Sequence, residues 1–160
     1  MKTNLMVATG GALAVVGVLQ MTIFPFNSSP SIPMGIYMRT FSDPTVGSVV
    51  RFPVPAKATE ALKGKAPEHV MKLLENPHTH FMKNVVGIEG DTMCVKNGRF
   101  TVSSQPLGEV KKDWQAWSGC KKLGHGEIAV STPHPLSYDS RYYGAVDAST
   151  VQTVVPVLTW

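Results

Sequence analysis

Residues Asn27–Tyr37 have the sequence NSSPSIPMGIY and separate a long apolar run from the rest of the chain. A segment this rich in serine and proline is typical of a linker. The alternative interpretation is that Ser31 is a nucleophile. Pro30 and Pro33 lie on either side of it, and their fixed φ angles would restrict its backbone. Composition alone favours the linker, so the choice depends on the remaining sequence.

The apolar run, residues 5–24, contains no charged side chain. At about 1.5 Å per residue, a helix of this length spans a bilayer core of roughly 30 Å. A cleavable signal peptide is less favoured, because the small-x-small pattern at Ala12–Ala14 lies inside the run. We therefore expect a membrane anchor at residues 1–26, followed by one extracytoplasmic domain at residues 27–160.

The distribution of charge suggests a location and argues against some partners. Lys2 and the amino terminus favour a cytoplasmic N-terminus, which predicts a single-pass protein of a bacterial inner membrane with its domain in the periplasm. The net charge is only +4, without a basic cluster or a recognisable module, so we expect no nucleic-acid partner. Attraction to the headgroups of a lipid bilayer is a simpler use of this charge.

The pattern beyond residue 27 predicts a mainly β domain with a small helical insertion. Segments rich in β-branched residues predict strands at 36–39, 46–54, 81–88, 92–95, 126–132 and 151–158. Asn97-Gly98 predicts a type I′ hairpin. Pro53 and Pro156 suggest edge or terminal positions. Two short helices are expected within residues 56–75, and residues 103–122 are expected to be irregular.

Lys83 lies within the apolar strand predicted at 81–88. A lysine in such a strand usually points towards water. If it points inwards instead, burial lowers its pKa from about 10.4 towards neutrality, and the neutral amine can then accept a proton. The segment Ser137–Gly144, SYDSRYYG, places a carboxylate and an arginine close together and, taken alone, is a polar turn held by an Asp139–Arg141 pair.

Cys94 and Cys120 are the only cysteines. In an oxidising compartment they would form a disulfide, whereas in the cytoplasm two separate buried thiols are more plausible. His78 and His80 lack a compact set of carboxylate or cysteine partners, so we expect neither a metal nor a cofactor.

Three of these stretches together resemble the type I signal peptidase superfamily, and more closely the TraF-type maturation proteases of conjugative plasmids. The matching positions are Asn27, Ser29, Ser31, Pro33, Gly35 and Tyr37; Lys83, Val85, Val86, Gly87, Gly90 and Asp91; and Ser137, Asp139, Ser140, Arg141, Tyr142 and Gly144. They occur in the order found in the family, and the apolar run precedes the serine as it does there. The resemblance therefore argues strongly against a simple linker at Asn27–Tyr37.

The resemblance implies a Ser/Lys dyad in which Ser31 attacks the scissile carbonyl and Lys83 is the base. By the same analogy, the Ser31 N–H and the Ser29 hydroxyl hold the oxyanion. Ser137 would orient the Lys83 amine.

The resemblance also implies that Asp139 and Arg141 fix the loop as a pair, and a catalytic part for Asp139 is left open. The expected function is maturation of a membrane-inserted precursor, either a conjugative propilin or a general preprotein, by cleavage with or without head-to-tail cyclisation. The rival interpretation is a non-catalytic β-domain that acts as a scaffold in a transfer apparatus. A scaffold has no need of a buried Lys83 beside Ser31.

Overall fold

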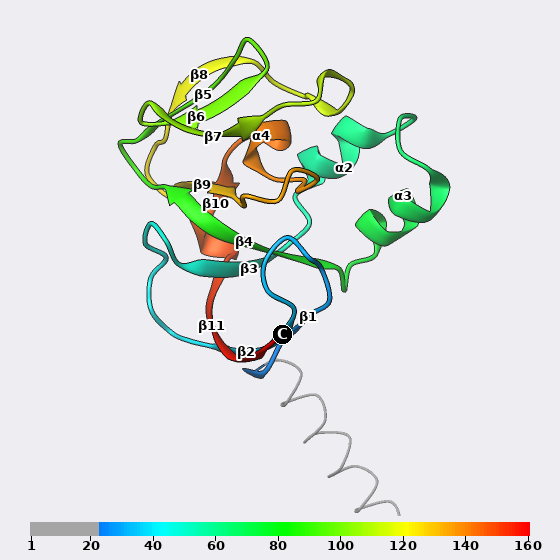
Figure 1. Ribbon diagram of the computed structural model, residues 1–160, viewed down its shortest axis with the longest axis vertical. Helices are drawn as coiled ribbons and strands as arrows, with labels where there is room; N and C mark the ends of the chain where they lie inside the picture. The colour runs from blue at the N-terminus through cyan, green and yellow to red at the C-terminus, as the bar shows by residue number, and fades with distance from the viewer. Residues whose placement is uncertain (1–22) are drawn as a thin grey trace, which may run out of the picture.

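The computed structural model describes residues 23–160, which form two antiparallel sheets with short helices between and beside them (Figure 1). The mainly β fold with little helix is therefore confirmed. The predicted anchor lies almost entirely outside the described residues. Within residues 23–160, no helix is long and apolar enough to cross a membrane.

The larger sheet occupies the lower and central part of Figure 1. In spatial order, its seven strands are β1 (Phe26–Asn27), β2 (Gly35–Arg39), β11 (Gln152–Thr159), β3 (Val49–Pro53), β4 (His80–Gly87), β9 (Glu127–Ser131) and β10 (Val146–Asp147). The C-terminal strand thus lies between two of the first strands of the chain. This arrangement makes the strand after Ser31 depend on residues more than a hundred positions away.

The smaller sheet lies at the top of Figure 1. Its four strands are, in order, β7 (Gln105–Glu109), β6 (Arg99–Val102), β5 (Thr92–Lys96) and β8 (Gly119–Lys122). The hairpin predicted at Asn97-Gly98 is confirmed, with φ angles of 51° and 70°. Cys94 on β5 faces Cys120 on β8, and the two are joined by the expected disulfide.

The prediction that residues 103–122 are irregular was wrong in part, because β7 and β8 lie within this segment. The turn into β7 is formed by Ser103 and Ser104, which have φ angles of 46° and 69°. Tight hairpin turns of this kind usually carry glycine or asparagine, so a serine pair gave no turn signal. The 3₁₀ turn η1 (Lys112–Trp114) connects β7 to β8.

The helical insertion is confirmed as α2 (Ala56–Leu62) and α3 (Glu68–Glu75), at the right of Figure 1. The segment at Ser137–Gly144 is more than a polar turn, since it contains the one-turn helix α4 (Ser140–Tyr143). Asp139 caps this helix and accepts a hydrogen bond from the Arg141 N–H. A second 3₁₀ turn, η2 (Ala148–Thr150), leads into β11.

The two prolines have different outcomes. Pro53 is the last residue of β3, which agrees with a terminal position. Pro156 suggested an edge strand, but β11 lies inside the sheet. The proline is tolerated because β11 pairs with β3 only through Gln152–Val154, whereas the Pro156 half pairs with β2 alone, next to a register shift.

Gly35 allows β2 and β11 to approach closely. Its φ angle is +148°, and a Cβ atom placed there would lie 2.0 Å from the carbonyl oxygen of Leu158. A side chain would therefore push the C-terminal strand away from the segment that follows Ser31.

We predict that Gly35→Ala destabilises the protein more than Gly47→Ala does. Gly47 also has a positive φ angle, +94°, but has no atom within 4 Å of its Cβ position. Both variants incur backbone strain, while only Gly35→Ala must displace backbone, at a further cost of about 1–3 kcal/mol. Urea unfolding measures the difference, and equal losses of stability would contradict the close-approach argument.

Candidate active site

The turn that carries Ser31, between β1 and β2, is held together by one buried amide. Asn27 Nδ2 donates to the carbonyl oxygens of Ser29, Ile32 and Pro33 at 2.8, 3.1 and 3.1 Å. Its Oδ1 accepts from the Ser29 N–H at 3.1 Å. The sequence identified Asn27 only as a motif position, because nothing local indicates that its side chain would bind this turn.

The floor beneath the turn is apolar and fixed from β2. The Tyr37 hydroxyl donates to the Pro33 carbonyl at 2.7 Å. Ile32 is buried and packs with Tyr37, Met82 and Val154. The backbone around Ser31 is therefore held in place on both sides, which agrees with a rigid site rather than a linker.

Lys83 extends from β4 to this turn, and its Nζ lies 3.0 Å from Ser31 Oγ. The side chain is only 4% exposed, so it points inwards, as the protease interpretation requires. The ring of Phe81 lies beside the amine, with its centroid 5.6 Å from Nζ.

Burial lowers the pKa of Lys83 from 10.5 to about 8 because the ammonium is removed from water. Among nearby charges, Asp139 raises this pKa and Arg141 lowers it, so their effects oppose each other. About a tenth of the amine is then neutral at pH 7. A neutral Nζ can accept the Ser31 hydroxyl proton, whereas a charged one donates to that oxygen.

Ser29 lies beside the nucleophile candidate. Its Oγ is 2.9 Å from Ser31 Oγ and accepts from the Ser31 N–H at 3.3 Å. The two groups expected to hold an oxyanion are therefore adjacent, but here they bond to each other. A ligand oxygen would have to replace that contact to receive both hydrogen bonds.

Asp139 and Arg141 form a fully buried, bidentate ion pair. Arg141 Nε donates to Oδ1 at 2.8 Å and Nη2 donates to Oδ2 at 3.0 Å. The carboxylate also accepts from the Ser131 hydroxyl and the Thr132 N–H, both at 3.3 Å. None of its recorded hydrogen bonds joins Ser31 or Lys83, so the geometry favours the structural role of Asp139.

Ser137 is buried, but its expected hydrogen bond to the Lys83 amine is not formed. Ser137 Oγ has no hydrogen-bond partner among the described residues. The same is true of the nearby Tyr143 hydroxyl, whose pKa is raised well above 10 by burial. The orienting role of Ser137 therefore remains a prediction.

Ser31 and Lys83 lie in a cleft of about 570 Å³. Its other walls include Phe24–Asn27, Leu73, His78–Met82, Leu136 and Tyr138. No cluster of three metal-ligating side chains occurs within residues 23–160, although two histidines line the cleft.

One edge of β4 is open along this cleft. The strand pairs with β3 from His80 to Asn84, but pairs with β9 only from Asn84 onwards. Val85 bonds to the β3 side through Gly47 and Ser48. By the alternation of antiparallel pairs, the backbone groups of His80 and Met82 point to the other side, where the described residues provide no strand. An extended chain can pair there beside Lys83.

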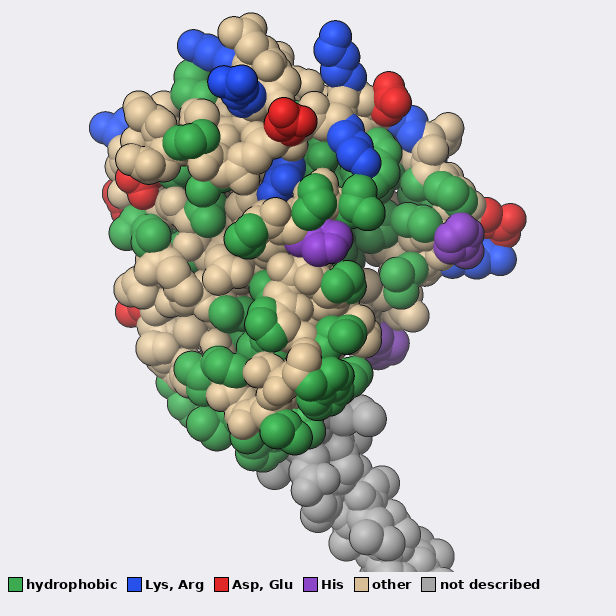
Figure 2. All heavy atoms as spheres, in the orientation of Figure 1, with side chains coloured by type: hydrophobic (Ala, Val, Ile, Leu, Met, Phe, Trp, Pro, Cys, Tyr) green, Lys and Arg blue, Asp and Glu red, His purple; other side chains and the backbone are tan. Residues whose placement is uncertain are grey.

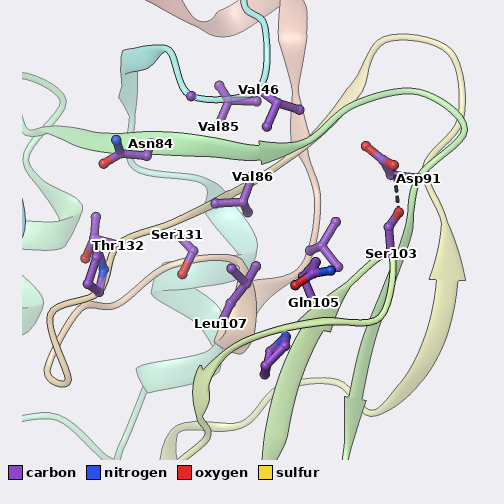
Figure 3. Close-up of a pocket in the computed structure, with 14 residues that line it drawn as sticks. Val46, Asn84, Val85, Val86, Asp91, Ser103, Gln105, Leu107, Ser131 and Thr132 are labelled. Carbon is purple, nitrogen blue, oxygen red and sulfur yellow. Dashed lines mark hydrogen bonds between the residues drawn. The ribbon is translucent and has the colours of Figure 1, made fainter.

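A larger cavity of about 680 Å³ contains neither Ser31 nor Lys83. Figure 3 shows Asn84 and Val86 of β4 at this cavity together with Leu107 and Gln105, while Asp91 accepts a hydrogen bond from Ser103 at its far end. Its lining is largely apolar, and its one pairing of a hydroxyl with a carboxylate, Ser103 with Asp91, has a poor base, because hydrogen bonds from the Ile88 N–H and the Ser103 hydroxyl lower the pKa of Asp91. The chemistry therefore places the candidate active site in the smaller cleft.

Comparisons with known proteins were made for the whole chain. The model of the family described as signal peptidase, peptidase S26, matches residues 3–160. The plasmid transfer protein TraF of Escherichia coli is 26% identical over 164 residues, covering 94% of the chain and 92% of that protein. Signal peptidase I of Leptolyngbya laminosa is 28% identical over 124 residues, covering 75% of the chain and 55% of that protein.

Among solved structures, a signal peptidase I from Enterococcus faecalis matches 72% of the chain and 99% of its own, with a TM-score of 0.42 and 17% sequence identity.

We predict that Lys83 makes stability depend on pH between about 8 and 10.5. In this window the unfolded lysine still binds a proton that the folded one has released, so stability rises with pH. The gain relative to Lys83→Met amounts to roughly 3 kcal/mol. Urea unfolding of both proteins at several pH values measures it, and parallel curves would show that Lys83 has an ordinary pKa.

We predict that Asp139→Asn lowers the free energy of unfolding by about 3–5 kcal/mol, because it leaves the buried Arg141 without its counter-charge. Asp147→Asn is the matched control, since Asp147 also caps a short helix but is exposed. We expect a much smaller effect there. Similar losses in the two variants would mean that the ion pair does not stabilise the fold.

Proposed function

Since the chain belongs to the signal peptidase family, peptidase S26, it is a serine peptidase of the type I signal peptidase kind, and we propose that Ser31 is its nucleophile and Lys83 its general base. The observation that carries this proposal is the 3.0 Å contact between Ser31 Oγ and an amine that burial makes easier to deprotonate. A scaffold without activity would gain nothing from burying a lysine at this position.

In the proposed reaction, Ser31 Oγ attacks the scissile carbonyl while its proton passes to the neutral Lys83 amine. The hydrogen bond between the Ser31 N–H and the Ser29 hydroxyl breaks, and both groups then donate to the oxyanion. Losing one such donor typically costs about 2.7–4 kcal/mol. Lys83 then protonates the leaving amine, and Ser31 remains as an acyl ester. Water releases an acid from this ester, whereas an amine of the substrate itself releases a cyclic amide.

Roles for the surrounding polar residues follow from their positions. We assign to Ser137 the orientation of the Lys83 amine, once substrate or a side-chain rotation brings the two together. Asp139 and Arg141 act on the base indirectly, because their ion pair fixes the loop that carries Ser137.

The proposed substrate is a membrane-inserted precursor that binds in an extended form along the open edge of β4. The similarity of nearly the whole chain to a plasmid transfer protein makes a conjugative propilin the first candidate. The similarity to a signal peptidase I supports a general preprotein as the second. In both cases the precursor presents its cleaved bond close to a bilayer.

An apolar face supports a position at the lipid surface. Figure 2 shows hydrophobic side chains gathered at the lower end of the domain, opposite most of the lysines and arginines. The exposed members from β1, β2 and β11 and their ends include Phe26, Met34, Ile36, Met38, Val155, Val157, Leu158 and Trp160. An aromatic residue such as Trp160 suits the membrane–water boundary. We propose that this face rests on the bilayer in which the anchor, residues 1–26, is inserted, with the domain in the periplasm.

We predict that Ser31→Ala and Lys83→Ala each reduce processing of a propilin in membranes by about 10⁴-fold or more. Ser118→Ala and Lys72→Ala, which change exposed residues outside the cleft, are the matched controls. The wild-type rate should rise with pH through a midpoint near 8 as the amine loses its proton. Mass spectrometry of the product distinguishes a linear peptide from a cyclic one, which is lighter by one water.

Normal processing by both dyad variants, at wild-type levels of membrane-inserted protein, would refute the peptidase assignment of these residues.

A further inference from the structure

The helical insertion, α2 and α3, reaches the catalytic cleft through α3. Leu73 of α3 lines the cleft, and so does Leu136 from the loop that follows β9. Each is 58% exposed. Exposed leucines that converge on a cleft are typical of a surface that binds an apolar group.

A second chamber of about 230 Å³ adjoins this part of the cleft. Its walls are Leu62, Lys65, Ala66, Pro67, Val70 and Leu74 from the insertion, and Phe81, Trp114, Leu136 and Tyr138 from the body of the domain. The chamber shares Phe81, Leu136 and Tyr138 with the catalytic cleft. It therefore begins where the cleft containing Ser31 ends, and Lys65 is its one charged wall residue.

The chamber is held open by its own walls. The Tyr138 hydroxyl donates to the Ala58 carbonyl of α2 at 2.9 Å, which ties the loop to the insertion. The Tyr138 ring also stacks on Tyr142 at 5.3 Å and meets Trp114 edge-on at 6.2 Å. An apolar cavity of about 150 Å³ is enough to hold benzene, so this chamber is large enough for an aromatic or long aliphatic side chain.

The strand geometry directs substrate side chains to this chamber. Phe81 and Lys83 are two residues apart on β4, so their side chains lie on the same face of the sheet. A chain paired with the open edge of β4 places alternate side chains on that face, about 6.6–6.8 Å apart. The substrate side chain two residues away from the reacting residue at Lys83 therefore lies over Phe81, at the wall that the chamber and the cleft share.

We propose that this chamber is a specificity site that binds a large apolar side chain of the precursor, an even number of residues from the residue whose carbonyl Ser31 attacks. The proposal rests on the proposed function, since it names a substrate determinant of the same site. The insertion α2–α3 then selects the substrate, while the turn at Ser31 and the strand β4 supply the chemistry.

The test uses the full chain in detergent micelles and pairs of internally quenched peptides that span a propilin processing site. Each pair carries either phenylalanine or alanine at one position. We expect wild type to prefer phenylalanine by about tenfold or more in kcat/KM at one position. Ala66→Phe, which fills the chamber, should bring that ratio close to one. Ala116→Phe, the same change at an exposed residue outside both cavities, should retain the wild-type ratio.

Peptide affinity for Ser31→Ala, measured by calorimetry, gives a second readout that needs no cleavage. The same preference for phenylalanine in binding supports the proposal even if Ala66→Phe folds poorly. Cleavage by wild type without such a preference at any position would overturn the specificity site and leave the proposed function standing. If wild type neither cleaves nor binds any of the peptides, both the specificity site and the proposed function are overturned.

Discussion

The contact between Arg141 and Asp139 lies where the two sheets and the helix α4 meet. The guanidinium makes a bidentate pair of hydrogen bonds to the carboxylate, and it also donates to the Ser131 hydroxyl and the Thr132 carbonyl at the end of β9. From the smaller sheet, Gly108 of β7 covers it so closely that a Cβ atom would lie 3.1 Å from Nη1. Charges this deeply buried are tolerated only when they are paired and hydrogen-bonded, so three elements must fit around one pair.

The reactivity of Lys83 depends on this pair in an indirect way. A lone carboxylate near a buried amine would raise the pKa of the amine, and a lone guanidinium would lower it. Because both are present and bonded to each other, their effects on Lys83 oppose one another and burial becomes the dominant influence on its pKa. The protein thus keeps a polar framework next to Lys83, the proposed base, without fixing its amine in the charged form.

Much of the fold could be predicted because its signals are local. The strand at 81–88 and the Asn97-Gly98 hairpin follow from side-chain pattern and turn chemistry. The turn at Ser103–Ser104 could not, because its positive φ angles are required by the tight pairing of β6 with β7 and are not signalled by its own residues. In the site, the partner of Lys83 came from a family resemblance, whereas the amide of Asn27 that binds the Ser31 turn depends on three-dimensional packing. The same applies to Ser137, whose buried hydroxyl has no partner in the structure.

The place of β11 between β2 and β3 has a consequence for the order of events during synthesis. The Trp160 N–H donates to the Met34 carbonyl, and Phe26 and Trp160 lie with their ring centroids 6.0 Å apart. The strand that follows Ser31 therefore acquires its inner neighbour only after residues 152–159 have been synthesised. Contacts of such long sequence separation form late. Until β11 is in place, β2 lacks this neighbour and the turn that carries Ser31 lacks the support of Val154.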